Sequence, residues 1–135
     1  MNWDFKNFSR SEFVCKHCGQ LPEIAEYHYF YMVFYQLQPF RTNIGRKVII
    51  TSGYRCPTHN KEIGGAVRSY HTIPVNPTLY HPCAVDFYVP GLTTLQAEDI
   101  IPAIFNVNFC GYHIYFREDD TWLCHIDWRG YKARW

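Results

Sequence analysis

The sequence has almost no excess of charge of either sign and no long apolar run. Its 13 Lys and Arg residues nearly balance 12 Asp and Glu residues, for a formal net charge of +1, so no basic stripe for nucleic acid is expected. No window reaches the roughly 18 apolar residues of a membrane span. Residues 1–10 alternate polar and aromatic side chains, without the apolar core of a signal peptide. We therefore expect no nucleic-acid or membrane partner and no export signal.

Repeats, linkers and low-complexity segments are also lacking, which argues against a second domain or an attached binding module. A chain of 135 residues, 47% of them hydrophobic, is large enough to bury one core and too short for two. We predict a single domain over residues 1–135, in which residues 1–22 form a cysteine-containing N-terminal arm.

The apolar patterns predict helices and strands in alternation, which is an α+β fold. The aromatic run within residues 23–38 has strand-like propensity, but its length favours a buried helix that Pro39 kinks or ends. The other predicted elements are a strand at 47–51, a short helix from Pro57 to about Gly64, a strand at 83–89, a helix at 93–105 capped by Thr93 or Thr94, and a hairpin of 111–116 and 121–127.

Three separate segments offer two imidazoles and one carboxylate, from His71, Asp86 and His125. Two neutral imidazoles and a carboxylate fill three corners of a Zn²⁺ tetrahedron, and the fourth is left for a water whose pKa falls to about 7. Side-chain alternation along the last strand places His125 and Asp127 on one face, opposite Cys124 and Ile126. The set is that of an open catalytic zinc site.

Short motifs surround these residues along most of the chain from about position 37. They are Ser52-Gly53-Tyr54-Arg55, His59-Asn60, Gly64-Gly65-Ala66, Ser69-x-His71, Ala84-x-Asp86-Phe87, His125-x-Asp127 and the closing Arg134-Trp135. Together they resemble the M15 family of zinc D-Ala-D-Ala carboxypeptidases and endopeptidases. The resemblance implies the hedgehog/DD-peptidase fold, with a small, mostly antiparallel sheet and flanking helices. It also implies one catalytic Zn²⁺, held by His71, Asp86 and His125.

The resemblance further implies a substrate, the peptide stem of bacterial peptidoglycan. Arg55 matches the arginine that holds a substrate carboxylate in the family, which suits a planar, bidentate guanidinium; its alternative is a salt bridge at the strand end. Ser69 either donates a hydrogen bond to substrate or caps the local turn. Such a hydrolase without a signal peptide is expected to be a phage lysis enzyme, acting from the host cytoplasm on the cell wall, or a component of a virion.

Two features depart from the family pattern. The stretch between His71 and Asp86 is longer than in relatives, and its segment 72–82 contains three prolines, which predicts a stiff loop at the rim of the site. That loop carries His81, a weaker candidate for the ligand role of His71. The second departure is Trp122, which stands where relatives commonly carry the acid that serves as general base.

Asp127 is the leading candidate for that base, because it shares a strand face with His125. The alternative is that Asp127 accepts a hydrogen bond from His125 and orients it. Weaker candidates are two hairpin acids and one strand histidine: Glu118, Asp120 and His113. Because no acid replaces Trp122 locally, a second hypothesis is a non-catalytic zinc-binding structural or cell-wall-binding protein of the same fold.

Six cysteines remain to be explained, at positions 15, 18, 56, 83, 110 and 124. Cys15 and Cys18 have the C-x₂-C spacing of zinc knuckles, and Cys56 with His59 would complete a second, structural zinc site. A disulfide from Cys15 or Cys18 to Cys56 is the competing interpretation, and free buried thiols are the third. The other three cysteines, 83, 110 and 124, lie in or beside apolar strands and are predicted to be core residues.

Overall fold

The computed structural model describes residues 1–66, 69–72, 83–105 and 108–135. The helices are α1 (Glu23–Met32), α2 (Gln38–Ile44), α3 (Pro57–Glu62) and α4 (Thr94–Ile104), with η1 (Arg10–Glu12), η2 (Val33–Leu37) and η3 (Tyr70–Thr72) as short helical turns. The strands are β1 (Ile49–Ser52), β2 (Ala84–Tyr88), β3 (Gly111–Phe116), β4 (Trp122–Asp127) and β5 (Ala133–Arg134). The predicted α+β domain is confirmed. His81 and most of the predicted rim loop, residues 73–82, lie outside the described residues.

The five strands form one sheet in the order β1-β2-β4-β3-β5. All neighbours pair antiparallel except β3 and β5, which are parallel. This order makes β2 and β4 direct neighbours, so that Asp86 pairs with His125. Two residues that are 39 positions apart in the sequence are therefore fixed side by side by the register of the central strands.

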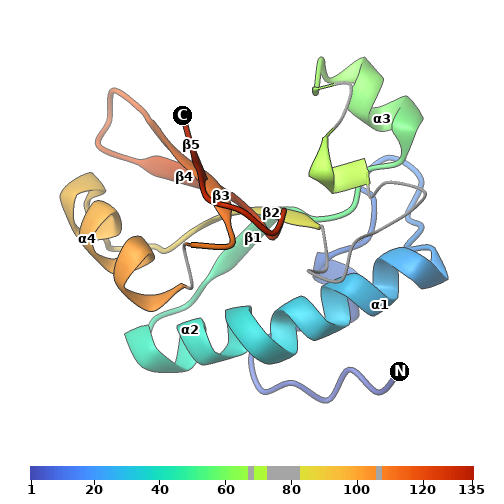
Figure 1. Ribbon diagram of the computed structural model, residues 1–135, viewed down its shortest axis with the longest axis horizontal. Coiled ribbons are helices and arrows are strands. Elements are labelled where there is room, and N and C mark those ends of the chain that lie inside the picture. The colour runs from blue at the N-terminus through green and yellow to red at the C-terminus, as the bar shows by residue number, and fades with distance from the viewer. Residues whose placement is uncertain (67–68, 73–82, 106–107) are drawn as a thin grey trace.

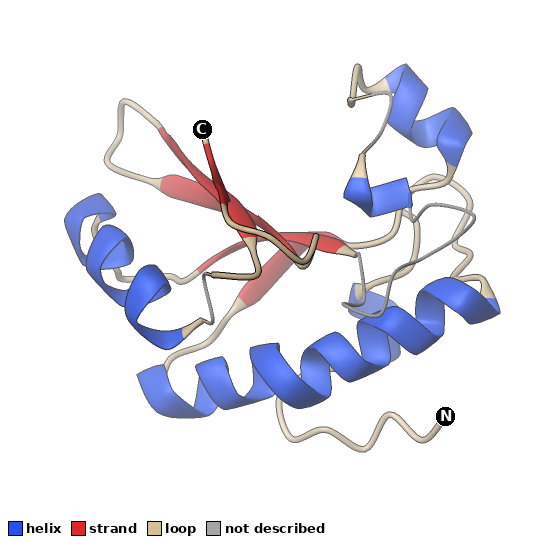
Figure 2. Ribbon diagram, in the orientation of Figure 1, coloured by secondary structure: helices blue, strands red, loops and turns tan. Residues whose placement is uncertain are grey.

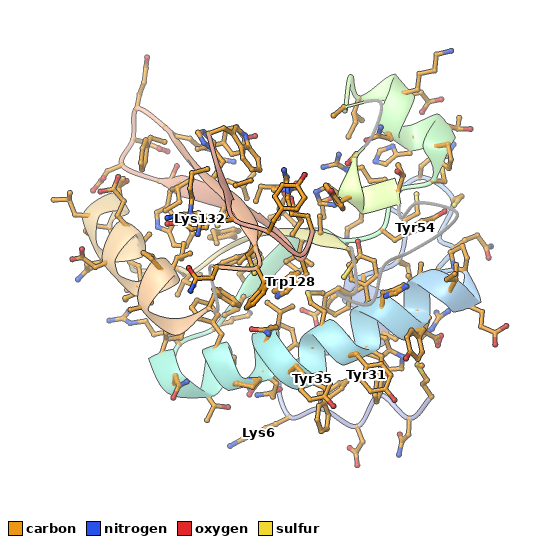
Figure 3. All side chains as sticks on the ribbon, in the orientation of Figure 1. Lys6, Tyr31, Tyr35, Tyr54, Trp128 and Lys132 are labelled. Carbon is orange, nitrogen blue, oxygen red and sulfur yellow. The ribbon has the colours of Figure 1, made fainter. Side chains whose placement is uncertain are left out.

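The aromatic run of residues 23–38 is helical, as predicted, but the helix does not end at Pro39. It passes through the π-helical turn η2 and continues as α2, with Pro39 in the first turn of that segment, before Gly45 ends it with φ of 63°. A wider π turn just before a proline accommodates the missing N–H and the bulk of the ring. Figure 1 shows the resulting long helix running beneath the sheet, with α3 on the other side. Tyr31 and Tyr35 stack along this helix, away from the sheet (Figure 3).

The core lies between this long helix, the sheet and α4, as the layers in Figure 2 show. Phe40 of α2 stacks on Phe105 with ring centroids 4.4 Å apart and meets Phe87 of β2 at 5.7 Å. The N-terminal arm is part of the same core, because Phe8 and Phe13 are buried in it. No helix among the described residues is long and apolar enough to cross a membrane.

Side chains of β4 alternate between the core and a pocket. Cys124 and Ile126 are fully buried in the core, whereas His125 and Asp127 occupy the opposite face, as predicted. Cys83 and Cys110 are also buried core residues. Trp122 belongs to the core side too, where its indole N–H donates to the carbonyl of Leu92 at 3.0 Å. One face of β4 therefore packs in the core, and the opposite face carries His125 and Asp127.

Candidate metal centre

His71, Asp86 and His125 come together from η3, β2 and β4. One nitrogen of each imidazole and an oxygen of Asp86 all lie within 4.8 Å of one another. Asp86 Oδ1 is 3.2 Å from His71 Nε2 and 3.1 Å from His125 Nδ1. The three predicted ligands thus lie together. His71 is buried, and Asp86 and His125 are partly buried.

The second nitrogen of each imidazole is held by the protein. His71 Nδ1 lies 2.7 Å from the carbonyl oxygen of Gly53, to which it donates, and His125 Nε2 lies 2.8 Å from Asp127 Oδ2. In a neutral imidazole only one nitrogen carries a proton. With those protons directed to Gly53 and Asp127, two nitrogen lone pairs point at one carboxylate oxygen. A cation between the three groups would satisfy all of them, and Zn²⁺ accepts these donors.

Burial and the neighbouring groups shift the pKa values of all three residues. Burial lowers the pKa of His71 and keeps that ring neutral. For Asp86, burial raises the pKa, but the adjacent imidazoles of His125 and His71 outweigh it and hold the pKa well below its usual range. For His125, burial lowers the pKa, but the adjacent carboxylates of Asp127 and Asp86 outweigh this effect and raise the pKa. Asp86 is therefore an anion ready to bind a cation.

Arg55 supports the carboxylate of Asp86. Its Nη2 donates to Asp86 Oδ2 at 3.0 Å, while its Nε donates to Ser52 Oγ at 3.1 Å and its Nη1 to Asn60 Oδ1 at 3.2 Å. The salt bridge that the sequence left open as an alternative is present. Arg55 also lines the pocket, so substrate contact by its further N–H groups stays a prediction.

The motifs around Arg55 have structural roles that the geometry explains. Gly53 is close to the backbone of Phe13, where an added Cβ would come within 2.7 Å of the Phe13 Cα, and only glycine allows that approach. Asn60 is buried and donates to the carbonyl of Ala66 at 2.8 Å. The N–H of Gly65 in turn bonds the Asn60 carbonyl at 2.8 Å. Together these contacts hold the guanidinium of Arg55 against the carboxylate of Asp86.

Ser69 acts on the turn that carries His71. Its Oγ accepts a hydrogen bond from the His71 N–H at 3.2 Å, and its carbonyl accepts one from Thr72 Oγ1 at 2.6 Å. The capping role that the sequence left open is therefore observed. Ser69 also lines the pocket, and a contact with substrate stays a prediction.

Asp127 is fully buried, and both of its oxygens are engaged. Arg129 donates to Oδ1 and to Oδ2, each at 2.7 Å, and His125 donates to Oδ2 at 2.8 Å. Burial raises the pKa of Asp127, but the Arg129 and His125 hydrogen bonds outweigh it and lower the pKa. This geometry favours the orienting role over that of a general base, because a base needs an oxygen within reach of the water it deprotonates.

A pocket of ≈ 650 Å³ opens onto the three ligands. Its walls include Tyr70, Tyr115, Arg129 and Trp135. The Arg129 guanidinium lies over the rings of Tyr70 and Trp135, at 4.9 and 5.2 Å from their centroids. Among the described residues that line the pocket, Asp86 is the carboxylate. The pocket can therefore take an extended ligand against an aromatic and cationic wall.

Sequence reasoning missed Arg129 and Tyr70. Arg129 lies four positions after His125. The alternation that puts His125 and Asp127 on one face could have predicted Arg129 on the same face. Tyr70 gave no signal beyond its position next to His71. The hairpin acids Glu118 and Asp120 are exposed beside the β3–β4 turn and do not line the pocket. His113 is a β3 residue opposite His125, and its ring stacks on Trp135.

Three of the four residues predicted for a structural zinc site form a second cluster. The sulfur atoms of Cys15, Cys18 and Cys56 all lie within 4.8 Å of one another, whereas the imidazole of His59 groups with His17 and Glu62. The structure shows all of these cysteines as free thiols. The three predicted sulfur ligands are therefore close together. His59 contacts them through its backbone N–H, which donates to Cys56 Sγ at 3.4 Å.

Comparison with known families agrees with the motifs and the geometry. The family model described as Peptidase M15 matches residues 6–127. The chain therefore belongs to the M15 peptidase family, which is a class of metal-dependent peptidases, typically of zinc. No match was found among curated proteins or among solved structures.

Proposed function

We propose that this chain is a zinc peptidase that hydrolyses peptide bonds in the stems of bacterial peptidoglycan. The observation that carries the proposal is the approach of one nitrogen of each imidazole to Asp86 Oδ1, at 3.2 and 3.1 Å, on the floor of an open pocket. Family membership supports the same activity. When bound, zinc supplies a Lewis acid for the scissile carbonyl and lowers the pKa of water to about 7.

The protein's own groups hold and orient the ligands. Asp127 fixes the ring of His125 through Nε2, and the Gly53 carbonyl fixes the ring of His71 through Nδ1. Arg55 fixes the carboxylate of Asp86. Partners of this kind typically contribute 10- to 100-fold in metal affinity or activity. Asp127 and Arg55 are thus positioning residues, and Arg55 has further N–H groups with which to bind a substrate oxygen.

Tyr70 is suited to donate a hydrogen bond to the substrate. Burial and the neighbouring Tyr131 raise the pKa of its phenol, so the hydroxyl keeps its proton at neutral pH. It lines the pocket directly beside the ligand His71. A neutral donor at this position stabilises negative charge that develops on a carbonyl oxygen of the substrate.

The test is mass spectrometry of purified peptidoglycan after incubation with the protein. New stem-peptide ends that disappear with a chelator and return with added zinc are expected, and their mass identifies the bond and separates a carboxypeptidase from an endopeptidase. Asp86→Asn is the matched inactive control, because it keeps the side-chain shape and removes the anionic ligand.

A second candidate function is non-catalytic binding of zinc and cell wall. Two observations favour it. Among the described residues that line the pocket, Asp86 is the one carboxylate, and Trp122 belongs to the core. Folded, zinc-loaded protein that sediments with peptidoglycan and releases no stem ends would establish this second function and exclude the first.

A further inference from the structure

Three thiols from two distant parts of the chain meet outside the pocket. Cys15 and Cys18 lie in the N-terminal arm, and Cys56 follows β1 immediately before α3. Their sulfurs lie within 4.8 Å of one another, and none is in a disulfide. A disulfide joins only two sulfurs, so it would leave the third thiol unused in this cluster.

The spacing of the sulfurs fits a tetrahedral zinc ion. Zn–S bonds of about 2.3 Å at a tetrahedral angle put two sulfurs about 3.8 Å apart. Each sulfur is therefore within about 1 Å of its place in such a site. Thiolates are also the donors that structural zinc prefers, whereas Mg²⁺ and Ca²⁺ prefer oxygen.

The backbone around the thiols is already arranged as a ligand loop. The Gly19 N–H donates to the Cys15 carbonyl at 2.8 Å and the Cys15 N–H to the Gln20 carbonyl at 2.9 Å, which closes the C-x₂-C turn. Two sulfurs also accept backbone hydrogen bonds, Cys15 from the Cys56 N–H and Cys56 from the His59 N–H, each at 3.4 Å. Such N–H bonds stabilise and orient thiolate ligands.

Two histidines are close to these cysteines along the chain, His17 between Cys15 and Cys18, and His59 three residues after Cys56. The His59 ring stacks on His17 with centroids 5.7 Å apart and an interplanar angle of 13°. We propose that Cys15, Cys18 and Cys56 bind a structural Zn²⁺ whose fourth ligand is the imidazole of His59. The His59 ring, which faces His17 and Glu62 in this structure, turns toward the sulfurs when the ion binds.

This second site would tie the N-terminal arm to the segment that carries Arg55. The same junction already has one backbone bond, from the Tyr54 N–H to the Phe13 carbonyl at 2.9 Å, and Figure 3 shows Tyr54 in this region. Arg55 lies between Tyr54 and Cys56 and bonds Asp86. A metal at the thiols therefore stabilises the support of the catalytic ligands without taking part in their chemistry. The inference does not depend on which substrate the pocket binds.

The first experiment counts zinc per chain by native mass spectrometry of protein purified under reducing conditions. We expect two zinc ions in the wild type and one in Cys18→Ser, whose exposed side chain makes it the variant most tolerant of substitution. His71→Ala should also retain one, and the double variant none. Cys110→Ala, which removes a buried thiol far from the cluster, is the matched control and should retain two.

Replacement of zinc by Co²⁺ identifies the donors. A thiolate-to-cobalt charge-transfer band is expected in His71→Ala, which retains the sulfur site alone, and it should be absent from Cys18→Ser. His59→Ala should weaken binding at this site much more than His17→Ala. The reverse order would overturn the assignment of the fourth ligand.

The proposal is overturned if the wild type binds one zinc and its three thiols react with a thiol reagent as fast with zinc as with chelator. It is equally overturned if the isolated protein has lost two hydrogen atoms to a disulfide among these cysteines. Peptidoglycan cleavage is measured separately, so the failure of either proposal is distinguishable from failure of the other.

Discussion

The two clusters of metal-ligating side chains differ in their donor atoms and in their surroundings. The centre of His71, Asp86 and His125 uses nitrogen and oxygen and opens onto a pocket of ≈ 650 Å³. The cluster of Cys15, Cys18 and Cys56 uses sulfur and lies outside that pocket. Zinc sites with three nitrogen and oxygen ligands keep a position for substrate, whereas sulfur-rich sites are usually closed. The proposed catalytic and structural sites of this small domain therefore differ in both donor atoms and access to the pocket.

The two clusters are nevertheless joined through adjacent residues. Arg55 bonds the carboxylate of Asp86, and Cys56 is its next neighbour in the chain. A substitution in the sulfur cluster is therefore expected to have a smaller, indirect effect on the proposed catalytic centre. The variants below separate the two sites by the size of their effects.

The largest effect is expected for His125→Ala. Loss of a metal ligand should reduce peptidoglycan cleavage by more than the roughly 100-fold that an outer partner contributes, while the sulfur cluster keeps its zinc. The measurement is the initial rate of stem-peptide release, together with zinc content. His113→Ala, on the neighbouring strand directly opposite, is the control and should retain most activity. Equal losses in both variants would show that His125 is not a ligand.

The next effect is on stability and concerns Cys18→Ser. Free zinc at 100 times the dissociation constant stabilises a folded protein by about 2.7 kcal/mol, which corresponds to a rise in Tm of roughly 10 °C for a domain of this size. The His71→Ala variant, which keeps the sulfur cluster intact, should show this rise. Adding Cys18→Ser should remove it. A zinc-dependent Tm that survives the change would contradict a stabilising role for the cluster.

Asp127→Asn tests orientation against proton transfer. An orienting residue predicts zinc binding at the catalytic centre that is weaker by about 10- to 100-fold, with a parallel loss of activity that excess zinc restores in part. A general base predicts unchanged zinc affinity and a loss of activity that zinc does not restore. Competition with a chromophoric chelator gives the affinity, and the pH profile of the residual activity gives the second readout.

The metal-free protein should lose stability in acid partly through Asp127. Its pKa in the folded state is lowered, chiefly because the Arg129 and His125 hydrogen bonds outweigh burial, so its contribution is present above the unfolded pKa of about 3.9. That contribution disappears as the pH falls through the folded pKa. Urea unfolding between pH 6 and about pH 3 should show a flatter dependence in Asp127→Asn. Asp4→Asn, at an exposed position near the N-terminus, should leave the dependence closer to the wild type.

The smallest effect is expected far from both sites, at the start of α4. Thr93 accepts the Gln96 N–H at 3.2 Å, and the Gln96 side chain accepts the Thr93 N–H at 2.8 Å. Thr93→Ala removes half of this capping box and should cost about 1 kcal/mol in the free energy of unfolding. Zinc content and cleavage should not change. A loss of zinc in this variant would show that zinc binding depends on the overall stability of the domain, which contradicts the prediction.

Much of the fold could be predicted from local patterns. The helices and strands around residues 23–38, 57–62, 93–105 and 111–127 are present where the periodicity, the prolines and the capping threonine placed them. The fate of Pro39 could not be predicted in this way, because a π turn just before it absorbs the defect. That choice depends on packing of the long helix against the sheet, which no short window of sequence contains.

The sequence by itself determined which residues could form the metal centre, because the period-two alternation of β4 puts His125 and Asp127 on one face and the motifs single out His71 and Asp86. Only the tertiary structure decided which nitrogen of each imidazole faces the carboxylate, and that Asp127 bonds His125 and Arg55 bonds Asp86. It also brought the three thiols together. The physical reason is that alternation is local, whereas hydrogen-bond partners follow from strand register and loop closure between distant segments.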